Sequence, residues 1–255
     1  MTEIMYAGIV DNSTIDYPHK NSAVVYLCGC PYRCPWCQNK DLLTMDSPNC
    51  RKTNINEIIT ELNKNYLIQA VCVTGGEPMM QEETITLLKK IKKETDLLLK
   101  IDSNCFYPNR LSKAIKYLDY FTTDIKAPLD IRYGKVTGLP DRWEQITKTV
   151  KESHKILKDW INPKEARTTI IPGLLETKEE IIKVAEIIAD IGFTEYTIQQ
   201  FRPENTLDPA YEKKQSPSRD KLIKLAQAAK AKLPETNVQI VTLEGGFEQI
   251  KTTTP

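Results

Sequence analysis

Short apolar runs typical of β-strands alternate with amphipathic helical patterns along most of this chain. The runs predict six strands, at Ala23–Cys28, Ala70–Thr74, Leu97–Ile101, Tyr120–Ile125, Thr168–Ile171 and Tyr196–Gln200. The patterns between them predict five helices, near Ile55–Asn63, Glu83–Lys93, Leu111–Lys116, Trp143–Leu157 and Lys178–Ile191. Alternation of this kind indicates parallel strands joined by right-handed crossovers. The sequence therefore predicts an α/β fold whose functional side chains collect at the carboxyl ends of the strands.

The helix predicted at Lys178–Ile191 has well-marked ends. Its apolar residues recur at the spacing of one helix face. Thr177 stands three residues before Glu180, which is the spacing of a capping box. Gly192 follows the last helical residue, where a C-cap is expected.

The alternating pattern loosens after Phe201. Residues 202–218 contain three prolines and several charges, so they predict a loop. A helix at Arg219–Leu233 and a strand at Val238–Leu243 follow. Because the sequence contains no internal repeat and no convincing linker, we expect residues 1–203 to form the main domain. Residues 204–255 are then a C-terminal extension packed on that same domain.

The composition argues against several classes of protein. Lys plus Arg number 35 and Asp plus Glu 34, so the net charge is +1 and binding of nucleic acid through phosphate charges is disfavoured. The longest apolar runs are far shorter than the ~18–20 residues that span a bilayer. The first residues lack the basic-then-apolar layout of a signal peptide. The chain is therefore predicted to be cytoplasmic, where seven cysteines indicate metal or redox chemistry rather than a disulfide framework.

Four of the cysteines lie between residues 28 and 37, just after the first predicted strand. The segment contains two prolines and predicts a loop, in which the thiols of Cys30, Cys34 and Cys37 can surround one compact inorganic centre. Closed zinc sites and most iron–sulfur clusters take four protein ligands, so three ligands leave one metal position open. Cys28 as the fourth thiolate of a zinc site is the alternative, although its place at a strand end favours packing.

The remaining cysteines and the histidines carry no clear pattern. Cys50, Cys72 and Cys105 are each predicted to be buried small apolar residues or incidental thiols rather than ligands, and Cys50 differs in lying in a loop. His19 and His154 have no partner pattern and are predicted to be structural or solvated. The sequence does not support a Ser–His–Asp or Cys–His nucleophile.

The cysteine spacing C-x3-C-x2-C, with Trp36 before the last cysteine, resembles the cluster motif of the radical S-adenosylmethionine (SAM) enzymes. The segment Thr74–Pro78, which reads TGGEP, resembles the GGEP motif of the same superfamily. Ile15–Pro18 resembles the opening of the glycyl-radical-enzyme activases. Within these, the chain is most like the anaerobic ribonucleoside-triphosphate reductase activating proteins.

Three further segments resemble those that follow successive strands in the activases. Asp102–Asn104 resembles their D-T-N segment, Asp124–Lys126 their D-x-K segment, and Arg167–Gly173 their R…PG segment. The resemblance covers residues 8–203, so the C-terminal extension is not part of it.

The chain departs from the family pattern in a few places. Gln38 stands where many relatives have His, and Cys105 stands where Gly is usual. Gln199–Pro203 stands where pyruvate formate-lyase activases carry a His. No cysteine-rich insert lies between residues 37 and 75, which argues against additional clusters.

The resemblance implies a partial TIM barrel, (β/α)6, with parallel strands and outer helices, plus the C-terminal helix and strand. It implies a [4Fe–4S] cluster held by Cys30, Cys34 and Cys37, with SAM on the open iron. Reductive cleavage of SAM would give methionine and a 5′-deoxyadenosyl radical. The cofactor supplies this radical chemistry, and the protein supplies binding and orientation.

Ten other residues are implied to bind cofactors: Trp36, Gly75, Gly76, Glu77, Asp102, Ser103, Asn104, Asp124, Lys126 and Arg167. Gly75 and Gly76 would let the backbone approach SAM closely, with Glu77 fixing the turn. An ordinary strand-to-helix turn is the alternative. Asn104 would hydrogen-bond the ribose.

The charged residues of this set have two implied roles. Asp102 and Asp124 would hold a monovalent cation near the SAM carboxylate, with help from Ser103, which would relieve repulsion between the carboxylates. Lys126 and Arg167 would bind the SAM carboxylate or ribose. A structural salt bridge is the alternative for each of these two cations.

The combined interpretation is a radical SAM activase that abstracts hydrogen from a glycine of a partner glycyl radical enzyme. The favoured partner is an anaerobic ribonucleoside-triphosphate reductase, ahead of a pyruvate formate-lyase-like enzyme. The implied electron donor is of the flavodoxin or ferredoxin type. One alternative is a radical SAM enzyme that modifies a small molecule, peptide or tRNA, and another is a non-enzymatic zinc-binding protein.

Overall fold

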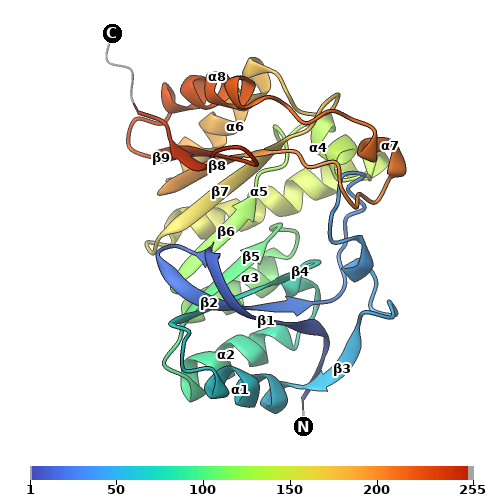
Figure 1. The fold of residues 1–255 in the computed structure, drawn as a ribbon, viewed down its shortest axis with the longest axis vertical. Coiled ribbons are helices and arrows are strands. Elements are labelled where there is room, and N and C mark those ends of the chain that lie inside the picture. Colours follow the sequence, from blue (N-terminus) through green and yellow to red (C-terminus); the bar gives the residue numbers. More distant parts are fainter. Residues whose placement is uncertain (1, 252–255) are drawn as a thin grey trace. The chain divides into compact units, whose positions relative to one another are not determined.

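The computed structural model describes residues 2–251 and shows strands and helices alternating along the chain (Figure 1). By its internal contacts the chain divides into two compact units. The first unit extends to Pro31 and resumes from Asn39 to Thr122. The second unit consists of Tyr32–Gln38 and the chain from Thr123 onward. The cysteine loop therefore begins in one unit and continues in the other.

The first unit has a sheet of five strands in the order β5-β4-β2-β1-β3. Their bounds are β1 Glu3–Tyr17, β2 Lys20–Leu27, β3 Arg51–Asn54, β4 Ala70–Gly75 and β5 Leu98–Ser103. β4 pairs in parallel with both β2 and β5, whereas β1 pairs antiparallel with both β2 and β3. The three parallel strands thus carry two antiparallel strands on one side.

Three helices belong to the first unit: α1 Ile55–Lys64, α2 Thr84–Glu94 and α3 Pro108–Ala114. α1 packs against α2, and α2 packs against α3 and β5; Figure 1 shows α1 and α2 side by side. Short 3₁₀ turns occur in the chain at Lys40–Leu42, Pro78–Met80, Ile115–Tyr117 and Pro140–Arg142. Each longer helix buries one apolar face, which in α1 consists of Ile55, Ile58, Ile59 and Leu62.

β6 (Tyr120–Asp124) carries the chain from the first unit into the second. There, β8 pairs in parallel with β7 and β9, and β10 pairs antiparallel with β9. The strand bounds are β7 Lys164–Ile170, β8 Glu195–Gln200, β9 Asn237–Thr242 and β10 Gly246–Gln249. The helices are α4 Ile131–Val136, α5 Trp143–Asp159, α6 Lys178–Ile191, α7 Pro209–Glu212 and α8 Arg219–Lys230. α5 packs against α4 and α6, and α8 packs against α6, β8 and β9.

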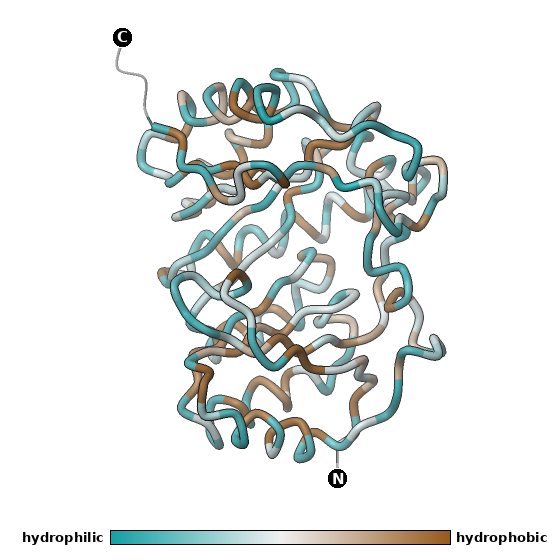
Figure 2. Tube along the Cα trace, viewed as in Figure 1, coloured by the Kyte–Doolittle hydropathy of each residue, from teal (hydrophilic) through white to brown (hydrophobic). Residues whose placement is uncertain are grey.

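The parallel strands are deeply buried, which accounts for their near-continuous apolar sequences. All four residues from Ala70 to Val73 in β4 have 0% exposure. Along the helices, hydrophobic and hydrophilic residues alternate instead (Figure 2). The longest helix, α5, buries the face that includes Ile146, Val150 and Leu157.

The predicted elements are present with shifted ends. The six predicted strands are β2, β4, β5, β6, β7 and β8, and the five predicted helices are α1, α2, α3, α5 and α6. The predicted ends of α6 are confirmed, because Thr177 and Glu180 form a capping box and Gly192 is left-handed with φ 75°. β1, β3 and α4 were not predicted. β1 is half exposed and so lacks a long apolar run, and α4 has only six residues.

The predicted C-terminal helix and strand correspond to α8 and β9, and the extension also contains α7 and β10. Its described part lies entirely in the second unit. The domain boundary near residue 203 stays a prediction. Within residues 2–251, no helix is both long and apolar enough to cross a bilayer.

Candidate active site

The predicted cluster loop directly follows β2. Cys30 belongs to the first unit, whereas Cys34 and Cys37 belong to the second. None of the three is in a disulfide; Cys30 and Cys34 are buried, and Cys37 is partly exposed. The Cys37 N–H donates to the Cys34 carbonyl at 3.0 Å, which makes a tight turn. Within residues 2–251, no three His, Cys, Asp or Glu side chains form a group that could hold a metal ion. The gathering of the three thiols around one centre therefore stays a prediction.

Backbone bonds and Asn104 fix the position of Cys30. The Cys30 N–H donates to the Leu43 carbonyl at 3.1 Å, and the Gly29 N–H donates to the Leu42 carbonyl at 2.8 Å. The side-chain amide of Asn104 donates to Cys30 Sγ at 3.7 Å. Hydrogen bonds to ligand sulfurs help to set the reduction potential of an iron–sulfur cluster. The sequence predicted a ribose contact for Asn104 and did not reveal this contact with the cysteine.

The buried Glu77 carboxylate fastens the turn after β4 to the end of β5. Its Oε1 accepts from the Met79 N–H at 2.9 Å and from the Ser103 hydroxyl at 2.8 Å. Its Oε2 accepts from the Asn104 N–H at 2.6 Å. Glu77 therefore ties the turn to the segment that presents Asn104. Contacts of these residues with SAM stay a prediction.

Gly75 and Gly76 pack against the protein backbone. A Cβ on Gly75, where φ is +130°, would lie 2.0 Å from the Leu27 carbonyl oxygen. A Cβ on Gly76 would lie 2.4 Å from the Gly29 carbonyl oxygen. Only glycine fits at either position, because the turn after β4 passes directly against the end of β2. The glycines thereby bring this turn beside the start of the cysteine loop.

Lys126 brings together several predicted residues of the second unit. Its ammonium donates to Asp124 Oδ2 at 2.8 Å and lies 5.0 Å from the centre of the Trp36 ring. Trp36 in turn donates its indole N–H to the Val136 carbonyl at 3.1 Å. Burial alone would lower the pKa of Lys126, but the charges of Asp124 and Cys34 outweigh burial and raise the pKa. Lys126 is therefore a fixed cation beside the cysteine loop.

Asp102 and Arg167 also form ion pairs within their own units. Asp102 pairs with Lys100. Arg167 Nε donates to Glu165 Oε2 at 2.9 Å, and Arg167 Nη2 forms an ion pair with the same oxygen at 2.8 Å. For Arg167 and Lys126, these pairs are the salt bridges that the sequence left as the alternative. Direct contacts with SAM stay a prediction.

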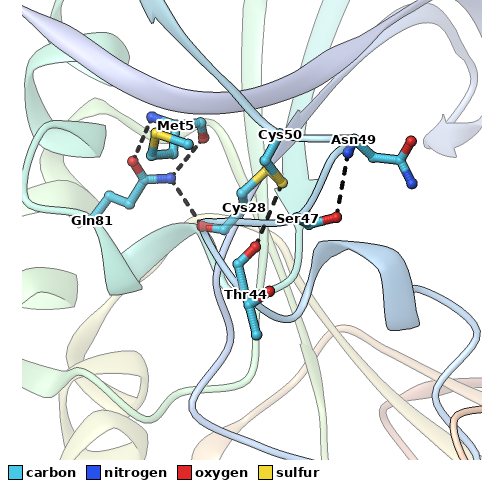
Figure 3. Close-up of a disulfide and its surroundings, with 7 residues drawn as sticks. All are labelled: Met5, Cys28, Thr44, Ser47, Asn49, Cys50 and Gln81. Atoms are coloured by element: carbon cyan, nitrogen blue, oxygen red, sulfur yellow. Dashed lines mark hydrogen bonds between the residues drawn. A yellow bond between two sulfur atoms is a disulfide. The ribbon is translucent and has the colours of Figure 1, made fainter.

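Cys28 and Cys50 form a disulfide (Figure 3). The predictions that Cys28 only packs at a strand end and that Cys50 is a buried apolar residue or an incidental thiol are wrong. For this pair, the expectation of metal or redox chemistry rather than a disulfide is wrong as well. Both β2 and β3 pair with β1, where Tyr6 faces Leu27 on one side and Arg51 on the other. The end of β2 and the start of β3 therefore meet across β1, with the two cysteine Cα atoms 6.2 Å apart.

The disulfide joins cysteines 22 residues apart, and the segment between them contains all three predicted cluster ligands. Gln81 supports it, because its amide donates to the Cys28 carbonyl at 3.0 Å and to the Met5 carbonyl at 2.8 Å (Figure 3). With Cys28 in a disulfide, the four-thiolate zinc site lacks its fourth ligand. The pairing was missed because it depends on β1 and β3, which the sequence did not predict.

Two departures from the family pattern have a structural account. The Gln38 amide donates to the carbonyls of Arg202 at 3.4 Å and Glu204 at 3.5 Å, so it ties the cysteine loop to the chain after β8. Cys105 is buried and has φ 63°. This left-handed conformation favours glycine, which is the usual residue at this position.

The other residues singled out by the sequence occupy ordinary environments. His154 is buried in α5, and burial lowers its pKa to about 4. His19 is exposed. Cys72 is buried, as predicted, but its thiol also donates to Asp102 Oδ1 at 3.5 Å. The sequence offered one signal for this polar contact, since Lys100 is a lone charge in an apolar run and a buried lysine needs a partner.

Comparison with known sequences gives the family. The radical SAM superfamily matches residues 24–188, which is more than half of the chain. A Methanocaldococcus jannaschii protein with the provisional name glycyl-radical enzyme activating enzyme is 31% identical over 246 residues, covering 96% of this chain and 98% of that protein. The pyruvate formate-lyase-activating enzyme of Clostridium pasteurianum is 30% identical over 190 residues, covering 72% of this chain and 74% of that enzyme.

Solved structures give the fold. A domain of pyruvate-formate lyase-activating enzyme from Bacteroides vulgatus matches with a TM-score of 0.53 at 16% identity, covering 68% of this chain and 99% of that domain. Methylornithine synthase matches with a TM-score of 0.60 at 15% identity, covering 85% of this chain and 63% of the other. The predicted fold class, a partial TIM barrel with parallel strands and outer helices, is confirmed.

The fold and the site thus define an α/β enzyme with a cysteine loop at the carboxyl end of its first parallel strand. The chain belongs to the radical SAM superfamily and, within it, to the glycyl-radical-enzyme activating enzymes. The family implies a [4Fe–4S] cluster and SAM as cofactors.

Proposed function

We propose that this enzyme holds a [4Fe–4S] cluster on Cys30, Cys34 and Cys37, binds SAM, and abstracts hydrogen from a glycine of a partner glycyl radical enzyme. The observation that carries the proposal is the family spacing of Cys30, Cys34 and Cys37, none of which is in a disulfide, in a chain of this family. The cluster would supply the electron that cleaves the C–S bond of SAM and releases the 5′-deoxyadenosyl radical. The remaining tasks, which are binding, orientation and exclusion of side reactions, belong to the residues of the chain.

The donor set fits an iron–sulfur cluster with one open metal position. Thiolates are the ligands that such clusters prefer, and three of them leave one iron for SAM. Cys28 does not compete as a fourth thiolate, because it is bound to Cys50. The Asn104 amide, directed at Cys30 Sγ, supplies the kind of N–H···S bond that iron–sulfur proteins use.

The SAM site is proposed to lie beside this loop. In the first unit, Glu77 holds Ser103 and Asn104 against the Gly75–Gly76 turn. That arrangement supports the turn as the partner of the SAM amino group. The other proposed cofactor contacts are Asp102 in the same unit and Trp36, Asp124, Lys126 and Arg167 in the second.

We infer that the partner is an anaerobic ribonucleoside-triphosphate reductase. The segment Gln199–Pro203, which stands where pyruvate formate-lyase activases carry a His, supports this choice over a pyruvate formate-lyase-like enzyme. A flavodoxin- or ferredoxin-type protein would deliver the electron. Because iron–sulfur clusters of this kind are sensitive to oxygen, we place the reaction in an anaerobic cytoplasm.

Electron paramagnetic resonance tests the proposal. The reconstituted protein is incubated anaerobically with SAM, a low-potential reductant and each candidate glycyl radical enzyme. We expect a glycyl radical signal with the reductase, and no signal when the target glycine of the reductase is replaced by alanine. If SAM is cleaved but no candidate acquires a radical, the activase role fails and modification of a small molecule, peptide or tRNA takes its place. If SAM is not cleaved, the whole proposal fails.

A further inference from the structure

β5 carries a buried lysine on the same face as Asp102. Side chains alternate along a strand, so Lys100 and Asp102 share one face, while Leu99 and Ile101 belong to the other. Lys100 has 0% exposure, and a buried ammonium requires a charged or hydrogen-bonding partner. Lys100 forms an ion pair with Asp102 Oδ1.

Cys72 adds to the surroundings of this pair. It faces Lys100 across the parallel pairing of β4 and β5. The Lys100 ammonium donates to Cys72 Sγ at 3.6 Å, and the Cys72 thiol donates to Asp102 Oδ1 at 3.5 Å. The carboxylate oxygen therefore receives hydrogen bonds from two side chains that the sheet holds in register.

Asp124, the other residue expected to hold a cation, has an ion pair of the same kind in its own unit. Lys126 is 8% exposed and donates to Asp124 Oδ2 at 2.8 Å. Each of the two carboxylates thus has a lysine two residues away in the sequence as its counter-charge. An ammonium at this distance cancels most of the attraction that a carboxylate exerts on a further cation.

We propose that Lys100 is the resident cation of Asp102, so that this enzyme binds SAM without a monovalent metal ion. The inference rests on the proposed function, because it concerns the β5 side of the SAM site. A metal ion at this place would need two carboxylates that lack a counter-charge. Asp102 and Asp124 do not meet this need, because each already forms an ion pair with a lysine. Lys100 acts as a positioning residue: its charge neutralises Asp102, and the sheet holds that charge in place.

SAM binding by the unaltered protein in different salts tests this proposal directly. The SAM dissociation constant of the reconstituted protein is measured in choline, sodium and potassium chloride at equal ionic strength. We expect the three values to agree within about two-fold, as for a general salt effect. A requirement for sodium or potassium, seen as a loss of about ten-fold or more in choline, overturns the proposal. Sodium-23 line broadening that disappears in Asp102→Asn also overturns it, and this readout needs no SAM cleavage.

Substitution of Lys100 gives a signature that a purely structural lysine would not show. Lys100→Ala removes the ammonium and leaves room for a small cation. We expect SAM affinity in choline to fall about ten-fold, because a charged hydrogen bond at Asp102 is lost. Affinity should recover with potassium or methylammonium but not with the larger tetramethylammonium. Lys92→Ala, which removes the exposed partner of Asp119, is the matched control and should leave the affinity unchanged.

A double variant separates charge from folding. The double variant Lys100→Ala with Asp102→Asn leaves no uncompensated buried charge, so it should fold even if Lys100→Ala alone is unstable. Its SAM affinity should be the same in choline, sodium and potassium chloride. A folded Lys100→Ala protein that shows no cation dependence overturns the proposal. Failure to bind SAM in any salt contradicts the proposed function itself, whereas cation dependence of an otherwise active wild type contradicts this inference alone.

Discussion

Asn104 shows how one side chain links the fold to the chemistry. Its N–H is held by Glu77 at 2.6 Å, and its side-chain amide reaches Cys30 Sγ at 3.7 Å. The sequence placed Asn104 in the site through its motif but could not show which atom it contacts. The same holds for Arg167 and Lys126, whose side chains form ion pairs with acidic residues two positions away. Motifs thus locate residues at strand ends, while side-chain direction depends on neighbours that the sequence does not identify.

Removal of the Asn104 amide should lower the reduction potential of the cluster. An N–H···S bond stabilises the reduced, more negative state. A net hydrogen bond of about 1 kcal/mol corresponds to a shift on the order of 40 mV for one electron. The potential of Asn104→Ala, followed by electron paramagnetic resonance during a redox titration, should fall by that amount. Asn63→Ala, which removes an exposed amide from α1, is the control; an unchanged potential in Asn104→Ala contradicts the assigned contact.

His154 should make the protein less stable in mild acid. Burial lowers its pKa to about 4 in the folded chain, against 6.5 for the free side chain. Between these values the unfolded chain binds a proton that the folded chain does not. Neutral His154 therefore makes its full contribution to the free energy of unfolding above pH 6.5. This contribution, about 3 kcal/mol in total, is lost as the pH falls toward 4.

Urea unfolding at pH 7 and pH 4.5 measures this effect. His154→Gln should lose less stability between the two pH values than the wild type. His19→Gln, at an exposed position, should behave like the wild type. Equal pH dependence in all three proteins contradicts a buried, neutral His154.

At the scale of elements, the strands with long apolar runs were predictable and the half-exposed strands were not. β4 was predictable because five of its six residues are buried, and α6 was predictable because its capping residues are recognisable in the sequence. β1 has only three buried residues among its 15 and no long apolar run. Missing β1 and β3 had a further consequence, since only their pairing shows that Cys28 and Cys50 meet.

The disulfide should stabilise the segment that carries the cluster cysteines. Closing a loop of 22 residues contributes about 3 kcal/mol by restricting the unfolded chain. We expect Cys28→Ala with Cys50→Ala to lower the free energy of unfolding of the cluster-free protein by about this amount. A dithiol should lower the stability of the wild type similarly and leave the double variant unaffected.

Thiol counting checks the pairing independently. Alkylation of the denatured, unreduced protein should modify the five cysteines outside the disulfide and spare Cys28 and Cys50. Prior treatment with a dithiol should make all seven reactive. Full alkylation without the dithiol would contradict the disulfide.

At the scale of the whole molecule, the order of strands and helices and the spacing of three cysteines were enough to predict the fold class and the family. The side-chain contacts of the site could not be predicted from the sequence, because they join side chains on separate strands. Lys100, Gln81 and the Cys28–Cys50 pair all act across strands that are distant in sequence. The seven cysteines consequently divide into a disulfide pair, a candidate cluster triad and the two buried thiols of Cys72 and Cys105.

The iron–sulfur content of cysteine variants measures this division of the cysteines most directly. Wild type, the single Ala variants of Cys30, Cys34 and Cys37, and the Cys28→Ala/Cys50→Ala protein are reconstituted anaerobically with iron and sulfide. The iron content per protein chain is measured, and the 5′-deoxyadenosine formed after addition of SAM and reductant is quantified. The wild type and the Cys28/Cys50 variant should both hold the cluster and cleave SAM, whereas each triad variant should lose SAM cleavage. A cluster that survives intact without a triad cysteine, or that requires Cys28 or Cys50 as a ligand, would contradict the account.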